Sequence, residues 1–177
     1  MYFLKEIFRE DVINTEGRTL HREAVRGIIL QQHTILMIYS PVNGDYKFPG
    51  GGVDENESCE KALIREVQEE CGAVLSHISQ EVGCVIEYSI PREINYDVFK
   101  MTSRYFLCNT DDDFREQNLD QYEQDLGFRP VRVDIDTAIQ TNNAILDATD
   151  RKIPPWTDRE TLVLKYIKEN ILLKNSI

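Results

Sequence analysis

Five segments of the chain have the apolar spacing of β-strands. Residues 24–32 and 34–40 are apolar runs separated by a short polar turn, which predicts two strands joined by a tight connection. Residues 81–89 and 97–110 also read as strands, and the turn between them contains proline and charged residues. A fifth strand is predicted at residues 130–135.

Between the second and third predicted strands the spacing becomes helical. This helix is expected to end at about Cys71, with Gly72 as the residue that terminates it. Its start is expected at a capping residue, for which Asp54, Asn56 and Ser58 are the candidates. The stripe that it turns toward the core is predicted to consist of Leu63, Ile64, Val67 and Cys71.

Two further helices are predicted at residues 136–146 and 158–174, on either side of a proline-containing break. The second is amphipathic, and one side of it consists of Leu162, Tyr166, Ile167 and Ile171. The polar, acidic stretch at 111–125 is expected to be a connection. Strands on both sides of the first helix, with a late second helical region, indicate an α/β sandwich whose helices cover a mixed β-sheet.

The length of 177 residues predicts a single domain spanning residues 1–177. Residues 1–20 contain a polar turn, and we expect them to form an N-terminal hairpin or arm. Because two subunits could exchange such an arm, a homodimer is kept as a candidate assembly.

Acidic residues outnumber basic ones, which narrows the classes of partner. There are 20 Lys and Arg against 31 Asp and Glu, a formal net charge of −11. This field repels nucleic acid, so a small molecule is expected as the partner. No apolar run is long enough to cross a bilayer, and the charged N-terminus is unlike a signal peptide, so we expect no membrane partner and a cytoplasmic location. The four cysteines lack CxxC spacing and are expected to be free thiols.

Three glutamates gather at the end of the first predicted helix, where anions are least stable. Glu66 precedes Glu69 and Glu70 by three and four residues, so their carboxylates converge and repel by about 0.2–0.5 kcal/mol per pair. The helix dipole adds about 0.3–1 kcal/mol for each exposed anion. Arg65 relieves only part of this charge by pairing with Glu69. A solvated acidic face is the commoner explanation, but convergent oxygen atoms also suit Mg²⁺.

Three consecutive glycines, Gly50–Gly52, directly precede this helix. Alone, such a turn is a flexible loop more often than a binding site. In front of an acidic helix it lets the backbone approach a ligand closely and add a carbonyl oxygen to the carboxylates.

Residues 51–73 resemble the Nudix hydrolase signature, G-x5-E-x7-R-E-U-x-E-E-x-G-U, in which U is a bulky aliphatic residue. The glycine and charged positions all match, and Ala73 departs from the pattern as a smaller residue at the final U. The matching residues are Gly51, Glu57, Arg65, Glu66, Glu69, Glu70 and Gly72, with Val67 at the first U.

The resemblance implies an α/β/α sandwich with a mixed sheet and a loop–helix–loop catalytic box. It also implies hydrolysis, dependent on Mg²⁺ or Mn²⁺, of a nucleoside diphosphate linked to another moiety. Glu57 is implied either to support the metal or to pair with Arg65. The implied metal ligands are Glu66, Glu69 and Glu70, with a carbonyl oxygen of the Gly50–Gly51 turn.

The general base implied by the resemblance is either Glu66 or a glutamate outside the box. Glu123 is the leading outside candidate. Glu93 and Glu116 rank behind it, because both are expected to be solvated loop acids.

Lys47 and Arg104 are the candidates for contacting substrate phosphates, although a single basic residue is equally often a surface charge. Tyr88 lies near the position where some dinucleoside polyphosphate hydrolases carry a tyrosine, but an aromatic residue of a strand more often belongs to the core.

Three functions are considered for this fold. A pyrophosphohydrolase acting on a nucleoside triphosphate or related nucleotide, as in MutT-like members, fits the complete set of box carboxylates. A non-catalytic nucleotide sensor or interaction module would be expected to lose some of them. An isopentenyl diphosphate isomerase-type enzyme would need additional cysteine and histidine positions, and the three histidines do not cluster. Hydrolysis is therefore preferred, and the substrate stays open among nucleoside triphosphates, dinucleoside polyphosphates and nucleotide sugars.

Overall fold

The computed structural model describes residues 2–172, apart from the side chain of Asp112. Its strands are β1 (Phe3–Phe8), β2 (Thr19–Ile28), β3 (Leu30–Gln31), β4 (Thr34–Ser40), β5 (Asp45–Lys47), β6 (Ala73–Ser89), β7 (Val98–Phe114) and β8 (Arg129–Asp134). Its helices are α1 (Cys59–Cys71), α2 (Gln121–Asp125), α3 (Ile135–Leu146) and α4 (Thr157–Ile167), and a π-helical segment follows at Lys168–Leu172. No helix within the described residues is long and apolar enough to cross a membrane.

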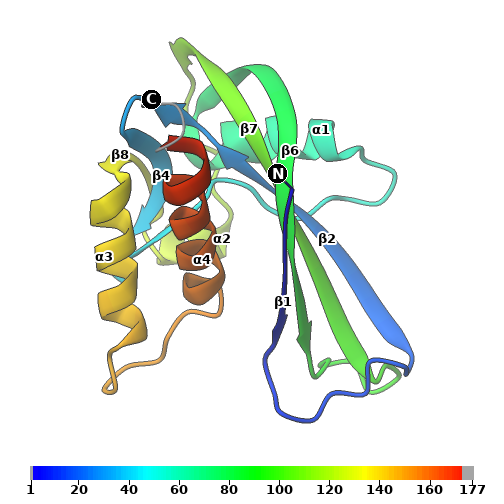
Figure 1. Ribbon diagram of the computed structural model, residues 1–177. Coiled ribbons are helices and arrows are strands. Elements are labelled where there is room, and N and C mark those ends of the chain that lie inside the picture. The colour runs from blue at the N-terminus through cyan, green and yellow to red at the C-terminus, as the bar shows by residue number, and fades with distance from the viewer. Residues whose placement is uncertain (1, 173–177) are drawn as a thin grey trace.

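The strands form two sheets (Figure 1). The larger sheet has the order β1-β6-β7-β2, in which β1 is parallel to β6 and β2 is parallel to β7, while β6 and β7 are antiparallel. The smaller sheet is antiparallel and has the order β3-β4-β5, with β8 also paired to β4. The larger sheet is therefore mixed, as expected.

Strand β4 is buried on both faces and separates two apolar cores. Ile35 and Met37 pack in one core with residues of α3 and α4. Leu36 and Ile38 point to the other face, as the two-residue period of a strand requires, and pack with residues of α1. Figure 1 accordingly shows α1 on one side of the molecule and α3 and α4 together on the other. The predicted α/β sandwich is confirmed.

Helix α1 begins and ends where its capping residues predict. The Ser58 side chain accepts a backbone N–H of the first turn, and Gly72 ends the helix in the left-handed conformation, with φ of 68°. The predicted inward stripe is wrong at one position, because Ile64 is 46% exposed. Ala62 and Glu70 lie on the buried face instead, together with the other three predicted residues.

The N-terminal segment does not form a hairpin with β2. Strand β1 runs parallel to β6, with Phe3 beside Gly83 and Phe8 beside Tyr88, and so extends the larger sheet at its edge. A parallel neighbour satisfies the backbone of β1 without a tight turn, and residues 9–18 then cross to β2.

The other elements differ from expectation mainly at their boundaries. Strand β7 continues into the acidic stretch predicted as a connection, and α2 occupies its end. Val163 and Leu164 of α4 are buried. Of the predicted apolar side, Ile167 is buried, Leu162 and Tyr166 are partly buried, and Ile171, which is partly buried too, lies in the π-helical segment. The last two residues of the predicted helix, 173 and 174, lie outside the described residues.

Glu160 joins α4 to the segment that leads into the glycine turn. Its side chain is fully buried, and Oε2 accepts the backbone N–H of Phe48 at 3.0 Å. Its Oε1 accepts a hydrogen bond of 2.6 Å from Arg159, which also pairs with Glu87 of β6. Because buried charges are stable only when paired, these contacts hold α4 against both the larger sheet and the turn.

Replacing Glu160 with glutamine should lower the free energy of unfolding by about 3–5 kcal/mol, because Arg159 then stays buried with one charge partner fewer. Asp158→Asn in the same helical turn is the matched control. The Asp158 side chain is 39% exposed and pairs with Arg9, so its loss should cost less than about 1 kcal/mol. Urea denaturation followed by circular dichroism measures both, and equal losses would contradict this role of Glu160.

Candidate active site

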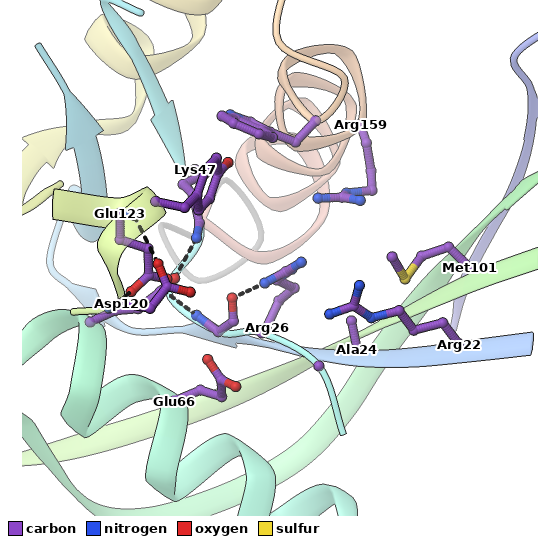
Figure 2. Close-up of a pocket in the computed structure, with 15 residues that line it drawn as sticks. Arg22, Ala24, Arg26, Lys47, Glu66, Met101, Asp120, Glu123 and Arg159 are labelled. Atoms are coloured by element: carbon purple, nitrogen blue, oxygen red, sulfur yellow. Dashed lines mark hydrogen bonds and ion pairs between the residues drawn. The ribbon is translucent and has the colours of Figure 1, made fainter. Parts of the chain in front are cut away.

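A cavity of about 480 Å³ lies where the glycine turn, α1, α2 and the start of α4 meet strands β2 and β7. Figure 2 shows Glu66, Asp120 and Glu123 at one end of it and Arg22 and Met101 at the other. The cavity is lined by equal numbers of acidic and basic residues. The acidic ones are Glu66, Glu70, Asp120 and Glu123, and the basic ones are Arg22, Arg26, Lys47 and Arg159.

Among the acidic lining residues, Glu70 is buried, with 1% of its surface exposed. Its Oε2 accepts the Gly50 backbone N–H at 2.7 Å, and its Oε1 pairs with Lys47. The Lys47 ammonium also lies 4.7 Å from the ring centroid of Phe128. These partners come from outside the helix, so the repulsion expected at Glu70 from α1 alone is offset.

The glycine turn lies too close to its neighbours for a side chain at two positions. Gly50 has a φ of 134°, and a Cβ there would lie 2.1 Å from the carbonyl oxygen of Val25. A Cβ on Gly51 would lie 2.2 Å from Oε2 of Glu66. The Val25 N–H donates to the Gly51 carbonyl at 2.9 Å and holds the turn against β2. Glycine therefore lets the turn touch both a strand and a carboxylate.

Arg65 lies beside the cavity and contacts one carboxylate from the loop before α1 and two from α1 itself. Its guanidinium contacts Glu57 at 2.8 Å and Glu66 at 2.7 Å. It also contacts Glu69 at 3.2 Å and donates to the Gly52 carbonyl at 3.1 Å. The hydrogen bond from Arg65 lowers the pKa of Glu57. Two roles were predicted for Glu57, and the structure shows the pairing with Arg65. Glu69 also contacts Arg65, and it does not line the cavity.

Burial raises the pKa of two carboxyl groups in the cavity. For Glu66 the burial outweighs the opposing hydrogen bond from Arg65, and the charge of Glu70 raises the pKa further. For Glu123, burial and then the charge of Glu70 raise the pKa to about 7. A reciprocal capping box holds Glu123 at the start of α2, where it exchanges hydrogen bonds of 2.9 and 3.1 Å with Asp120. Glu123 is therefore suited to accept a proton near neutral pH.

Arg26 reaches the glycine turn from β2. Its Nη1 donates to the Gly50 carbonyl, whereas its buried Nε makes no hydrogen bond to any other described residue. A buried donor without a partner costs about 1–3 kcal/mol, so an anion bound here would be stabilising.

Sequence reasoning overlooked three of the four basic lining residues. Arg22 and Arg26 share one face of β2 with Ala24 between them, and the two-residue alternation of the strand was a signal for this pair. Nothing in the local sequence marks Arg159, because it reaches the cavity through the packing of α4.

One predicted phosphate-binding residue lies elsewhere. Arg104 pairs with Glu23 at 3.2 Å and with Glu81 at 3.1 Å, and it does not line the cavity. The reason is strand alternation: Met101 of β7 faces the cavity, so Arg104, three residues later, points to the opposite face.

Two of the three outside glutamates are not part of the lining of this cavity. Glu93 and Glu116 are exposed and do not line it, which leaves Glu123 as the outside carboxylate that does. Tyr88 donates its hydroxyl to Glu6 at 3.1 Å and stacks on Phe8, so its contacts are with β1.

The donor atoms at the acidic end of the cavity fit a divalent cation. They are carboxylate and carbonyl oxygens, which Mg²⁺ and Mn²⁺ prefer. They belong to Glu66, Glu70, Glu123 and the backbone of Gly50. Among the side chains that the structure describes, no three acidic, histidine or cysteine groups already stand at metal-binding spacing. Instead, Lys47 pairs with Glu70, and Arg26 donates to the Gly50 carbonyl.

Comparison with known proteins gives a consistent family. A family model described as the NUDIX domain matches residues 20–156. The chain is 35% identical over 71 residues to the RNA pyrophosphohydrolase of a Nitratiruptor species, covering 38% of this chain and 46% of that protein. It is 41% identical over 62 residues to the 8-oxo-dGTP diphosphatase of Proteus vulgaris, covering 32% and 54%. The matches thus span about half the length of these relatives.

A solved structure shows the same fold. A NUDIX hydrolase from Nitrosomonas europaea superposes with a TM-score of 0.56 at 18% identity, covering 83% of this chain and 89% of that one. At this identity the likeness concerns the fold alone.

Glutamine substitutions compare the buried carboxylate of Glu70 with the partly exposed carboxylate of its neighbour, Glu69. Glu70→Gln should lower the free energy of unfolding by about 1–3 kcal/mol in EDTA, because Lys47 loses its buried partner. Glu69→Gln should cost less than about 1 kcal/mol, since that side chain is 33% exposed. Chemical denaturation measures both variants. If Glu70→Gln proves as stable as the wild type, the buried pair does not stabilise the fold.

Proposed function

The chain belongs to the Nudix family, whose model matches residues 20–156, and from this premise we propose that it is a metal-dependent pyrophosphohydrolase. The expected substrate is a nucleoside diphosphate linked to another moiety, in the simplest case a nucleoside triphosphate. One observation carries the proposal: a single cavity is lined by the carboxylates of Glu66, Glu70 and Glu123 and also by the guanidinium groups of Arg22 and Arg26. Carboxylates suit a divalent cation, and guanidinium groups suit phosphates.

Mg²⁺, or Mn²⁺ in its place, would be held by Glu66, Glu70 and the Gly50 carbonyl. Such an ion polarises phosphate oxygens and lowers the pKa of a bound water. Gly51 leaves the Glu66 carboxylate close to the turn, and Arg65 contacts it from the other side, so Glu66 is oriented from two directions. Glu69 would join the ligands only by turning away from Arg65.

The remaining cavity residues would have different roles toward the substrate. Glu123 would accept the proton of the attacking water, because it lines the cavity and its burial raises its pKa above that of a solvated glutamate. Glu66 is the alternative base. Lys47 and Arg26 would bind phosphate oxygens once a cation takes over their carboxylate and carbonyl partners.

The names of the matched relatives point to two substrate classes. One is an 8-oxo-dGTP diphosphatase and the other an RNA pyrophosphohydrolase. An RNA carries phosphoric anhydride bonds only in its 5′ phosphates, so its 5′ end presents the same reacting group as a free nucleotide. We favour the free nucleotide, because the net charge of −11 opposes a longer polyanion.

A non-catalytic nucleotide sensor is the alternative function, in which the same cavity would bind a nucleotide without turnover. We also propose that residues 1–177 act as one unit. Segments outside residues 20–156 support this, because β1 pairs with β6 and α4 contributes Arg159 to the cavity.

A substrate panel tests the function directly. The protein is incubated with Mg²⁺ and nucleoside triphosphates, 8-oxo-dGTP, a diadenosine polyphosphate, ADP-ribose and a short RNA with a 5′ triphosphate, and the products are identified by mass. We expect at least one substrate to be cleaved at a phosphoric anhydride bond, and cleavage to stop when EDTA removes the metal. Nucleotide binding without turnover of any of them would favour the sensor.

Glu123→Gln should lower kcat by about 10²–10⁴-fold, because the amide cannot accept a proton. Glu116→Gln is the matched control, since Glu116 is exposed and does not line the cavity, and it should keep wild-type kcat. A titration with Mg²⁺ distinguishes the possible roles of Glu123. An unchanged Mg²⁺ requirement in Glu123→Gln indicates the base, and a raised requirement indicates a metal ligand. Wild-type turnover in Glu123→Gln would exclude Glu123 both as the general base and as a metal ligand.

A further inference from the structure

The candidate active site continues into a second cavity of about 440 Å³. Four residues line both cavities and therefore form the passage between them: Arg26, Met101, Trp156 and Arg159. In Figure 2, Met101 lies at the end of the first cavity opposite Glu66 and Glu123. The second cavity thus opens at the end away from the catalytic carboxylates.

Strand β7 supplies an apolar floor for this second cavity. Phe99 and Met101 are two residues apart and so share one face of the strand. In the sheet register, Phe99 lies beside Ser89 and Met101 beside Glu87 of β6. All four residues line the second cavity, which therefore rests directly on the larger sheet.

The segment before α4 supplies an apolar wall. It contributes Pro155 and Trp156 to the lining. The indole Nε1 of Trp156 donates to Asp45 at 2.8 Å, which fixes the orientation of the ring. A phenyl ring, a thioether, a proline and an indole thus surround the space, and such surfaces are typical of sites for flat organic groups.

The charged groups of the second cavity are largely paired with one another. Arg9 pairs with Glu87 and with Asp158, and Arg159 also pairs with Glu87. Little unpaired charge is left there to attract a phosphate. At the passage, by contrast, the buried Nε of Arg26 has no partner among the described residues. Phosphates are therefore favoured in the first cavity, and a flat uncharged group is favoured in the second.

We propose that the second cavity binds the nucleobase of the substrate. The base lies against Phe99 and Met101, and the phosphates pass Arg26 toward Glu66 and Glu70. This inference rests on the proposed function, because it takes the first cavity to hold the phosphates. Stacking on a ring accepts any base, whereas the wall of the second cavity selects among bases by shape.

Calorimetry with and without a base tests the subsite. ATP, GTP, CTP, UTP and inorganic tripolyphosphate are titrated into the full chain, with Ca²⁺ in place of Mg²⁺ to suppress turnover. At least one nucleotide should bind about tenfold more tightly than tripolyphosphate. Trp156 is the one tryptophan of the chain, so its emission should change with that nucleotide. Tight binding without this change would place the base elsewhere and overturn the proposal.

Phe99→Ala should abolish the tighter binding of the nucleotide relative to tripolyphosphate. The affinity for tripolyphosphate should stay unchanged, and this unchanged affinity would also show that the variant is folded. Phe99→Leu, which keeps apolar volume and removes the ring, carries the test if Phe99→Ala does not fold, and it should lose part of the advantage. Phe114→Ala is the control, because Phe114 lies on β7, is 55% exposed and does not line the second cavity.

The outcomes separate the two proposals. Equal affinity for nucleotides and tripolyphosphate, or the same loss for both in the Phe99 variants, overturns the nucleobase subsite. Selective binding that depends on Phe99, without hydrolysis of any nucleotide, keeps the subsite and overturns the proposed function. Hydrolysis without base-dependent binding keeps the proposed function and overturns the nucleobase subsite.

Discussion

The buried pair between Glu70 and Lys47 is the interaction on which the geometry of the cavity depends. A carboxylate that is 1% exposed is unstable by several kcal/mol unless nearby groups compensate its charge. Lys47 at the end of β5 and the N–H of Gly50 provide that compensation. The last turn of α1, the end of β5 and the glycine turn must therefore come together. Once they do, Gly51 lies against Glu66 and the backbone of the turn faces the cavity.

The same balance of charge extends through the whole cavity. Four acidic and four basic residues line it, although the chain carries a net charge of −11. The basic residues come from β2, β5 and α4, which are distant in sequence, and the acidic ones come from α1 and from α2 with its capping residue. A long polyanion meets the field of the entire acidic surface. A small nucleotide that arrives with a cation meets only the balanced interior, because solvent screens the distant charges within about 10 Å. An acidic protein is thereby compatible with an anionic substrate.

The features that depend on neighbouring residues could be predicted from the sequence. Both caps of α1, the glycine turn and the cluster of glutamates lie within one short stretch. Which glutamate turns inward could not be predicted, because Glu69 and Glu70 differ by only about 100° around the helix, and the choice depends on Lys47, which lies more than 20 residues away. The positions of Arg104 and Arg22 relative to the cavity could not be predicted for the same reason. Strand alternation assigns each to a face, but the packing of α1 and α4 decides which face meets the cavity.

The proposed hydrolysis and the proposed choice of base depend on different parts of the fold. The carboxylates that would act on the phosphates come from α1 and α2, whereas the walls of the second cavity come from β7 and the segment before α4. That segment is held by Arg9, which follows β1, donates to the Pro155 carbonyl at 2.8 Å and pairs with Glu87 and Asp158. Arg9 precedes the region that the family model matches. Because Arg9 directly follows the edge strand β1 and holds this wall, changes at the N-terminal segment would alter the proposed fit of a base while the catalytic box keeps its geometry.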